Sequence, residues 1–383
     1  MTSLLDTLGP PATRRLTDAW TLGDVEIGNR VVLAPLAGIG NWFVRLQARR
    51  HGAGLVVSEM VSSFAVHHRN ERTSRELLRI HPDEHPVSIQ LFGHDPAVMA
   101  SAAERVAAAG ADLIDLNMGC PVPKVCKTGA GAALLHDPEL AVALARAAAH
   151  GSGLPVTVKL RSGLRPGDRS GLELARRLAE DGVVAGLCLH PRHASQRHAG
   201  QPDHEAAREL IESLPVPVMI SGGLRTPERV HEAFERTGAA AVALARGSLG
   251  NPWLFSQLLD GHSPKPSREQ ILAELDWVMD SAVDHLGEER AGRYLRKFYP
   301  WYVERLDGDK ALQDSLQRAP SLQALPSRSA VRSGWSGCRT NSPIFLYRRA
   351  RRRFPISTRS CTKACGAATD PSPWPSANRS LTS

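Results

Sequence analysis

The sequence has few cysteines and no long apolar run. Six cysteines among 383 residues are too few for a disulfide scaffold, which fits a protein of the reducing cytoplasm. No apolar stretch approaches the ~20 residues that a membrane-spanning helix needs. The first 20 residues carry charged side chains and lack the apolar core of a signal peptide. We therefore expect a cytoplasmic protein with no membrane partner.

Positive charge is in excess, but it is concentrated at one end of the chain. The net charge is +8, and residues 331–383, with nine Arg, one Lys and Asp370 as the single acid, contribute +9. The rest of the chain is close to neutral, so the total does not by itself indicate nucleic-acid binding. We expect residues 326–383 to be disordered because their composition cannot build a core. Our hypothesis is that a reading-frame shift produced this tail.

Eight apolar, β-branched segments alternate with helical segments. None alternates between apolar and polar residues, a pattern typical of strands covered on both faces. Helices predicted at 95–109, 137–149 and 226–236 each open with an N-cap residue followed by Pro. No GxGxxG follows the first strand, which disfavours a doubly wound sheet. The pattern predicts an α/β fold, a (β/α)8 TIM barrel. The predicted strands are 31–35, 55–59, 87–91, 113–117, 156–160, 186–190, 216–220 and 241–245.

Strand character ends after Leu259. Segments 267–286 and 289–306 carry apolar residues at helical spacing and predict a small helical domain. Past residue 325 all periodicity stops. We therefore expect four parts: an N-terminal extension at 1–24, the barrel at 25–262, a C-terminal helical domain at 263–325, and the tail at 326–383.

Polar residues recur at the ends of the predicted strands. Barrel active sites form where the carboxyl ends of the strands meet. Gln90, Lys159 and His190 inside or ending apolar strands are costly unless they are paired or functional. Each alone is compatible with a satisfied core side chain, but together they favour a ligand site. Lys159 stabilises negative charge on a ligand, pairs with Glu59, or does both.

The last two strands end in features suited to an anion. Ser221-Gly222-Gly223 ends the seventh strand and Arg246-Gly247 ends the eighth. Glycines allow backbone N–H groups to approach an anion, and an Arg adds a fixed pair of donors. Barrels commonly hold a phosphate at these two loops. The sequence thus favours a phosphorylated ligand over turn glycines beside a solvated Arg.

One block of sequence is specific enough to indicate a family. Asn117-Met118-Gly119-Cys120-Pro121 is followed by Lys124-Val125 and by glycine and leucine at 131–135. The block resembles the signature of flavin-dependent tRNA-dihydrouridine synthases. The resemblance runs from about Val25 to about Ala319. Further segments occur in the order expected for that family: 34–38, 58–60, 90–92, 158–161, 251–253, 296–298 and 301–302.

The resemblance implies an enzyme that binds FMN, reduces uridines in tRNA, and is re-reduced by NADPH or NADH. We expect no metal, because three cysteines of the tail, Cys338, Cys361 and Cys365, lack metal-type spacing and partners. We expect a monomer. The flavin would be held by Pro35, Leu36, Ala37, Gln90, Lys159 and His190 at its ring system and by Ser221, Gly222, Gly223, Ala245 and Arg246 at its phosphate.

The resemblance also assigns residues to the substrate. Asn117 and Arg161 would contact the uracil or a phosphate, and Arg293, Arg296 and Lys297 would hold the RNA backbone. An amphipathic helix with a solvated basic face explains the last three equally well.

Cys120 is implied as the proton donor. Saturating the 5,6 double bond of uracil needs a hydride at one carbon and a proton at the other, and a flavin supplies the hydride. A thiol, with an ordinary pKa of about 8.5, is mostly protonated at neutral pH and suits the acid role. The alternative is an inert buried thiol, as we expect for Cys126 and Cys188.

The chain departs from the family pattern in three places. Gly40-Asn41 stands where Thr-Asp is usual, His190-Pro191-Arg192-His193 replaces His-Gly-Arg-Thr, and Ala245 replaces a glycine. We expect Pro191, which lacks an N–H donor, to change the loop over the flavin. Two other functions compete: an FMN barrel that acts on a small molecule of dihydroorotate or enone type, and a non-catalytic barrel whose basic tail binds RNA. The sequence does not identify the target uridine or choose between NADPH and NADH.

Overall fold

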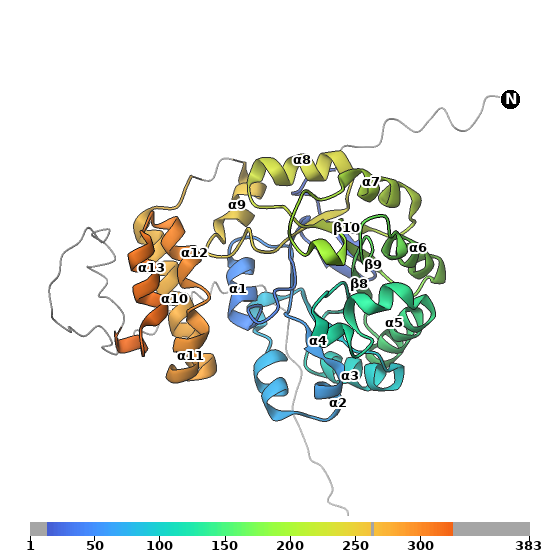
Figure 1. The fold of residues 1–383 in the computed structure, drawn as a ribbon, viewed down its shortest axis with the longest axis horizontal. Coiled ribbons are helices and arrows are strands. Elements are labelled where there is room, and N and C mark those ends of the chain that lie inside the picture. The colour runs from blue at the N-terminus through green and yellow to red at the C-terminus, as the bar shows by residue number, and fades with distance from the viewer. Residues whose placement is uncertain (1–13, 262–263, 325–383) are drawn as a thin grey trace, which may run out of the picture. The chain divides into compact units, whose positions relative to one another are not determined.

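The computed structural model of the protein describes residues 14–261 and 264–324. Within these residues, parallel strands form a closed ring (Figure 1). Pairing of β11 with β3 and of β4 with β6 closes the ring, and the two-residue strand β5 (Val61–Ser62) extends β6 at its end. The ring strands are β3 (Val31–Leu33), β4 (Leu55–Val57), β6 (Val87–Phe92), β7 (Leu113–Met118), β8 (Val156–Arg161), β9 (Gly186–His190), β10 (Val218–Ser221) and β11 (Ala241–Leu244).

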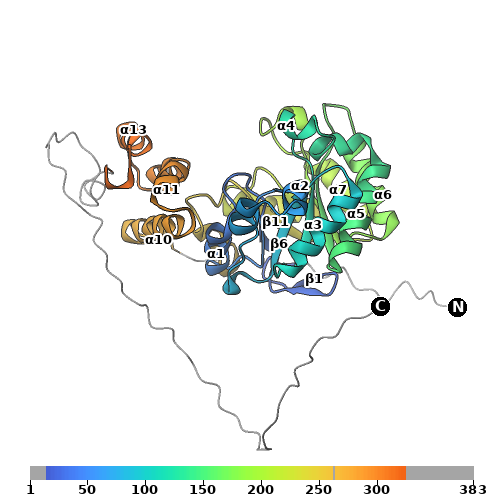
Figure 2. The same cartoon turned by 90° about the horizontal axis from the view of Figure 1, so that it is seen from below.

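Helices follow the strands and cover the outside of the ring (Figures 1 and 2). The side chains of Asp95, Asp137 and Thr226 cap three helices, each accepting a backbone N–H three residues ahead, with Pro next in sequence. The predicted (β/α)8 barrel is confirmed. Its helices are α1 (Trp42–Arg50), α2 (Ser63–His67), α3 (Pro96–Ala108), α4 (Pro123–Cys126), α5 (Pro138–Ser152), α6 (Ser170–Asp181), α7 (His204–Ser213), α8 (Pro227–Thr237) and α9 (Trp253–Asp260).

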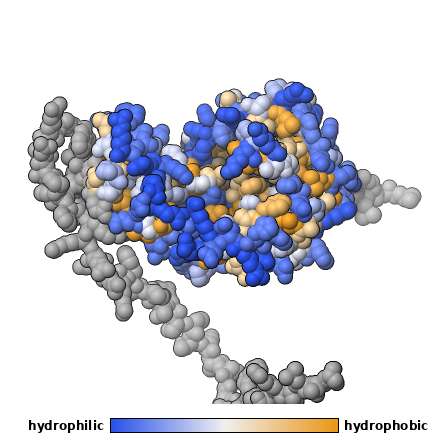
Figure 3. All heavy atoms as spheres, turned by 60° about the horizontal axis from the view of Figure 1, so that its bottom comes forward, coloured by the Kyte–Doolittle hydropathy of each residue, from blue (hydrophilic) through white to orange (hydrophobic). Residues whose placement is uncertain are grey.

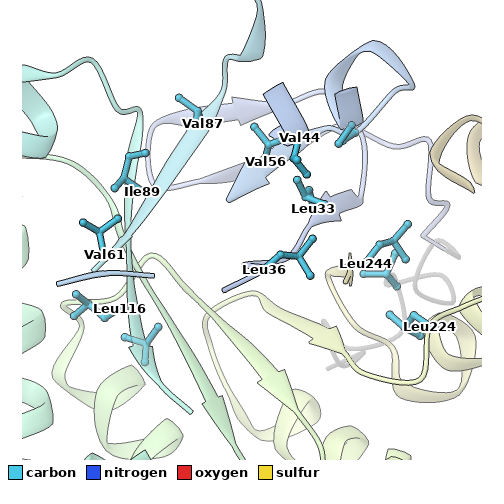
Figure 4. Close-up of a cluster of buried hydrophobic side chains, with 14 of the residues drawn as sticks. Leu33, Leu36, Val44, Val56, Val61, Val87, Ile89, Leu116, Leu224 and Leu244 are labelled. Atoms are coloured by element: carbon cyan, nitrogen blue, oxygen red, sulfur yellow. The ribbon is translucent and has the colours of Figure 1, made fainter. Parts of the chain in front are cut away.

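The barrel strands are buried on both faces, as their unbroken apolar character predicts. Every residue of β3, β4, β9, β10 and β11 is buried. Leu33, Val56, Ile89 and Leu116, from four strands, belong to one apolar cluster (Figure 4). Burying apolar surface of this kind supplies the main favourable term of folding.

A β-hairpin covers the amino end of the barrel. Strands β1 (Trp20–Leu22) and β2 (Val25–Ile27) pair antiparallel. Leu22 and Ile27 are fully buried in a cluster with Leu113 and Ala241, the first residues of β7 and β11. This end of the barrel is therefore closed, and a ligand can enter only where the strands end.

Four helices follow the barrel: α10 (Arg268–Leu286), α11 (Glu288–Leu295), α12 (Tyr299–Arg305) and α13 (Lys310–Arg318). The predicted helix at 267–286 is confirmed as α10, which Ser267 caps. The segment at 289–306 is helical as predicted, but it forms two helices, because the chain breaks between α11 and α12. Pro300 explains the break, since its ring would clash with the carbonyl four residues earlier. That carbonyl, of Arg296, accepts a hydrogen bond from Gln317 Nε2 at 3.1 Å instead.

The surface seen in Figure 3 is mostly hydrophilic, with apolar residues in small groups. Among the helices that the structure describes, none is long and apolar enough to span a bilayer. The predicted disordered tail at 326–383 lies outside the described residues.

A buried ion pair supports the loop between β3 and α1. Arg45 and Glu84 are both fully buried, and two N···O contacts of 2.7 and 3.0 Å join them. The guanidinium also donates to the carbonyls of Arg79, at 2.7 Å, and Gly40, at 3.2 Å. Because Gly40 directly precedes Asn41, the N-cap of α1, this pair ties the start of α1 to Glu84, in the segment before β6.

Replacing Arg45 by Met leaves the Glu84 carboxylate buried without its cation. We expect Arg45→Met to lower the free energy of unfolding by about 3–5 kcal/mol, the usual cost of breaking a buried pair. Urea denaturation followed by circular dichroism measures this. The matched control is Arg208→Met, which removes an exposed Arg–Glu contact on α7 and should leave stability nearly unchanged. Equal midpoints for the two variants would contradict the expectation.

Candidate active site

A cavity of about 640 Å³ opens at the carboxyl ends of the barrel strands. Its size lies within the range of small-molecule sites. Its lining includes six cationic side chains and no Asp or Glu, so it suits an anionic ligand. The cations are Lys159, Arg161, Arg192, Arg197, Arg225 and Arg246. The structure brings these sequence-predicted residues together in the lining: Pro35, Leu36, Ala37, Gln90, Asn117, Cys120, Lys159, Arg161, His190, Ser221, Gly222, Gly223, Ala245 and Arg246.

A chain of hydrogen bonds crosses three strands beneath the cavity. Asp115 accepts from Thr157 Oγ1 at 2.6 Å and from Gln90 Nε2 at 2.5 Å. Gln90 Oε1 accepts from Asn117 Nδ2 at 2.9 Å, and Asn117 Oδ1 accepts from the backbone N–H of Cys120 at 2.9 Å. One buried carboxylate is thus connected to the loop that carries the thiol.

The two ends of this chain set the direction of both amides. A carboxylate can only accept and a backbone N–H can only donate. Gln90 must therefore turn its NH2 to Asp115, and Asn117 must turn its oxygen to Cys120. Burial raises the pKa of Asp115 to about 6, and its bonds from Thr157 and Gln90 lower that pKa. The side chain is ionised at neutral pH, as this arrangement requires.

The Cys120 thiol is half-buried and lines the cavity. Burial raises its pKa above the ordinary value for a thiol, while a bond from the backbone of Val122 and the charge of Arg161 lower it. The thiol is therefore protonated at neutral pH. Cys126, expected to be a packing residue, directs its Sγ to the carbonyl of Cys120 at 3.3 Å.

Arg161 links two loops of the rim. It is 5% exposed and donates to the carbonyls of Gly119, at 3.1 Å, and His193, at 3.1 Å. Burial lowers its pKa to about 10, so it remains a cation beside the thiol.

The structure does not pair Lys159 with Glu59, one of the two roles predicted for this lysine. Its Nζ donates to Ser221 Oγ at 3.0 Å. Glu59 accepts from the backbone N–H of Gly38 at 2.7 Å instead, and its pKa is raised by burial. Lys159 also faces the buried Asp115 and lowers the pKa of that carboxyl. It thus joins the cavity's polar network rather than a pair with Glu59.

The end of β10 forms a backbone cradle. Gly222 and Gly223 have φ of +99° and +79°, and a Cβ on Gly222 would lie 2.4 Å from the His190 ring. His190 is buried, and burial together with the charges of Lys159 and neighbouring arginines lowers its pKa. Its Nε2 lies 3.1 Å from Arg192 Nη1, so the neutral ring accepts there and carries its proton on Nδ1.

Three arginines crowd this cradle. Burial lowers the pKa of Arg192 and of Arg246, and repulsion from Arg225 lowers both further. Arg192 is 6% exposed, donates to the carbonyl of Gly200 at 2.7 Å, and keeps its Nε without a partner among the described residues. Cations held together against their repulsion indicate an anion site.

Sequence reasoning missed Arg225 and treated Arg192 only as part of a divergent loop. Arg225 stands two residues after the glycine pair, and that proximity was the available signal.

The three basic residues predicted on the helical segment lie outside the cavity lining. Arg293 pairs with Glu289 at 2.6 Å, and Arg296 Nη2 donates to the carbonyl of Ala319 at 3.2 Å. Lys297 Nζ donates to the carbonyl of Gly38 at 2.9 Å. Across the described residues, no group of three or more His, Cys, Asp or Glu side chains is placed to hold a metal ion.

The hydrogen-bond chain predicts different outcomes for two substitutions of Asp115. Asp115→Asn retains an oxygen that accepts from Gln90, and its new NH2 can donate a hydrogen bond to Thr157 Oγ1. The free energy of unfolding should therefore stay near that of the wild type. Asp115→Val leaves the Gln90 NH2 buried and unpaired, which should cost about 1–3 kcal/mol of unfolding free energy. Urea denaturation at pH 7 compares the two.

The pH dependence of the unfolding free energy is the control for the comparison of wild type with Asp115→Asn. A pKa raised to about 6 means that the folded state holds the Asp115 proton more tightly than the unfolded state, whose value is 3.8. This group's contribution therefore falls as pH rises from about 4 to 6. The Asn variant lacks this loss and should gain on the wild type over that window. Parallel pH profiles would show that Asp115 has no raised pKa.

Comparison with known proteins identifies the family. A family model described as dihydrouridine synthase matches residues 32–330. The chain is 34% identical over 310 residues to tRNA-dihydrouridine synthase B of Pseudomonas aeruginosa, covering 79% of this chain and 92% of that protein. It is 35% identical over 294 residues to the synthase B of Xanthomonas axonopodis pv. citri, covering 74% and 86% respectively.

Among solved structures, morphinone reductase superposes with a TM-score of 0.51 at 15% identity, covering 68% of this chain and 93% of that one. This likeness concerns the barrel fold. The family match, the identity to its members and the cavity described above lead to one conclusion: the chain is an enzyme of the dihydrouridine synthase family.

Proposed function

We propose that this enzyme reduces uridines of tRNA to 5,6-dihydrouridine, with FMN as the hydride carrier and NADPH or NADH as the reductant. The observation that carries the proposal is the protonated Cys120 thiol in a cavity whose other lining groups suit an anionic cofactor. The names of the matched relatives support the substrate and the product. Because tRNA is the substrate, we expect the reaction to take place in the cytoplasm.

The residues present fit FMN. A phosphate dianion would satisfy the buried, unpaired Nε of Arg192 and relieve the repulsion among three arginines. Gly222 leaves open the space that a Cβ would fill. The phosphate would be held by Ser221, Gly222, Gly223, Ala245 and Arg246, and the ring system by Pro35, Leu36, Ala37, Gln90, Lys159 and His190.

When bound, FMN supplies a hydride to one carbon of the uracil 5,6 double bond. The Cys120 thiol donates the proton to the other carbon. The thiolate that remains is stabilised by the charge of Arg161 and the backbone of Val122, the two groups that favour its ionised form. Asn117, fixed by Gln90, holds the Cys120 backbone so that the thiol keeps its place during the transfer.

We propose that residues 263–325 form a tRNA-binding domain. A uridine stacked in RNA reaches a barrel cavity only when its nucleotide is flipped out, at a cost of a few kcal/mol. Contacts to the flanking backbone offset that cost. Arg293 is exposed and Arg296 is partly exposed, and both lie on or next to α11. They are the candidates for these contacts.

Removing the proposed acid tests the function. Purified enzyme, FMN, NADPH and tRNA transcribed without modifications should yield dihydrouridine, detected by mass spectrometry. Cys120→Ala should lose about 10²–10⁴ of the rate while it retains bound flavin, because general acids contribute that much. Cys126→Ser, a change at the neighbouring thiol, is the control. The absence of dihydrouridine with wild-type enzyme would refute the function, and full activity of Cys120→Ala would refute the role of the thiol.

Filling the glycine cradle tests the cofactor site. Gly222→Ala would place a Cβ against the His190 ring, so we expect flavin affinity to fall about tenfold or more. Flavin retained on purification, read from visible absorbance, measures this. Gly238→Ala is the matched control, since Gly238 has a similar left-handed φ of +65° but no atom within 4 Å of its Cβ position. Equal flavin content in both variants would refute the assignment of the flavin phosphate to this cradle.

A further inference from the structure

The loop between β3 and α1 forms part of the cavity wall. Pro35, Leu36, Ala37 and Ile39 line the cavity, and the first three are proposed flavin contacts. Its tip is held from outside the cavity. The N–H of Gly38 donates to Glu59 at 2.7 Å, and the Gly38 carbonyl accepts from Lys297 Nζ at 2.9 Å.

The next peptide group is held from the same side. Tyr294 donates its only hydroxyl hydrogen to the carbonyl of Ile39 at 2.6 Å. Its oxygen accepts in turn from Asn41 Nδ2 at 2.8 Å. Tyr294 and Lys297, near the end of α11, therefore bind two consecutive carbonyls of the cofactor loop although neither reaches the cavity.

Helix α11 has its own attachment to the barrel. Arg290 donates to both oxygens of Glu76 at 2.7 and 2.6 Å, and these bonds lower the pKa of Glu76 to about 2. The ring of Tyr294 packs edge-on against Phe43 of α1, with centroids 5.9 Å apart. Because these contacts do not involve the loop, α11 is a fixed support against which the loop is held.

We propose that Tyr294 and Lys297 are positioning residues for the flavin, acting through the backbone of the loop at residues 35–39. The inference rests on the proposed FMN site. A loop that is ordered before binding does not have to lose its freedom when the flavin binds, so affinity is higher than for a free loop. Without either bond, the loop samples other conformations and only a fraction of molecules is ready to bind.

The same bond gives Lys297 a different role from the one that its sequence context indicates. If Lys297 binds RNA, its replacement lowers the affinity for tRNA and leaves the affinity for flavin unchanged. If Lys297 holds Gly38, its replacement lowers the affinity for flavin even when no RNA is present. The two roles separate in an experiment that contains no RNA.

The test is a titration of flavin-free enzyme with FMN, followed by quenching of flavin fluorescence, for Tyr294→Phe and Lys297→Met. Tyr294→Phe removes the hydroxyl's bonds to Ile39 and Asn41, and Lys297→Met removes the bond to Gly38. Each change frees one carbonyl of the loop, so the dissociation constant should rise about 3- to 10-fold. Tyr299→Phe is the matched control for the first, because Tyr299 is 1% exposed and its hydroxyl has no partner among the described residues. Lys310→Met, on the exposed side of α13, is the control for the second.

The possible outcomes are distinct. Weaker flavin binding in the two variants, with both controls within twofold of the wild type, supports the inference. Wild-type affinity in Tyr294→Phe and Lys297→Met overturns it. Unfolding midpoints are measured for all four variants, and a loss of affinity no greater in Tyr294→Phe than in Tyr299→Phe also overturns it. Failure of the wild type to bind FMN instead refutes the proposed function.

Discussion

Closure of the parallel strand ring is the constraint on which the site depends. Once β11 pairs with β3 and β4 with β6, every strand must end at the same rim. Residues that are far apart in sequence, such as Gln90 and Ser221, then line one cavity. The hairpin of β1 and β2 covers the other end of the barrel, so the polar rim is where a ligand can enter.

Within that ring, a single buried carboxylate organises the polar groups. Asp115 can only accept, and its position opposite Thr157 in the register of β7 and β8 brings it within reach of Gln90 on the other side. Its charge also faces Lys159, whose presence lowers the cost of keeping it ionised. The orientation of Asn117 and the place of the Cys120 loop follow from this one residue.

Charge in the site is arranged for two tasks. Around β10, burial and mutual repulsion lower the pKa values of Arg192 and Arg246, an arrangement suited to an anionic ligand. Around Cys120 burial outweighs the nearby cation, so the pKa of the thiol rises and the proton stays in place. One cavity thus combines a cationic cradle with a protonated thiol and has no carboxylate in its lining.

The sequence by itself determined the barrel, most of its strand limits and the residues of the rim. Strands buried on both faces have uninterrupted apolar runs, and Asp-Pro and Thr-Pro mark helix starts independently of the rest of the chain. The block around Cys120 indicated the family because its characteristic residues are consecutive in the sequence. The tertiary structure alone decided the break before α12, the partner of Lys159 and the bonds of Lys297 and Tyr294 to the loop between β3 and α1. These contacts join residues separated by up to 259 positions, and such pairs are set by how elements pack rather than by any local pattern.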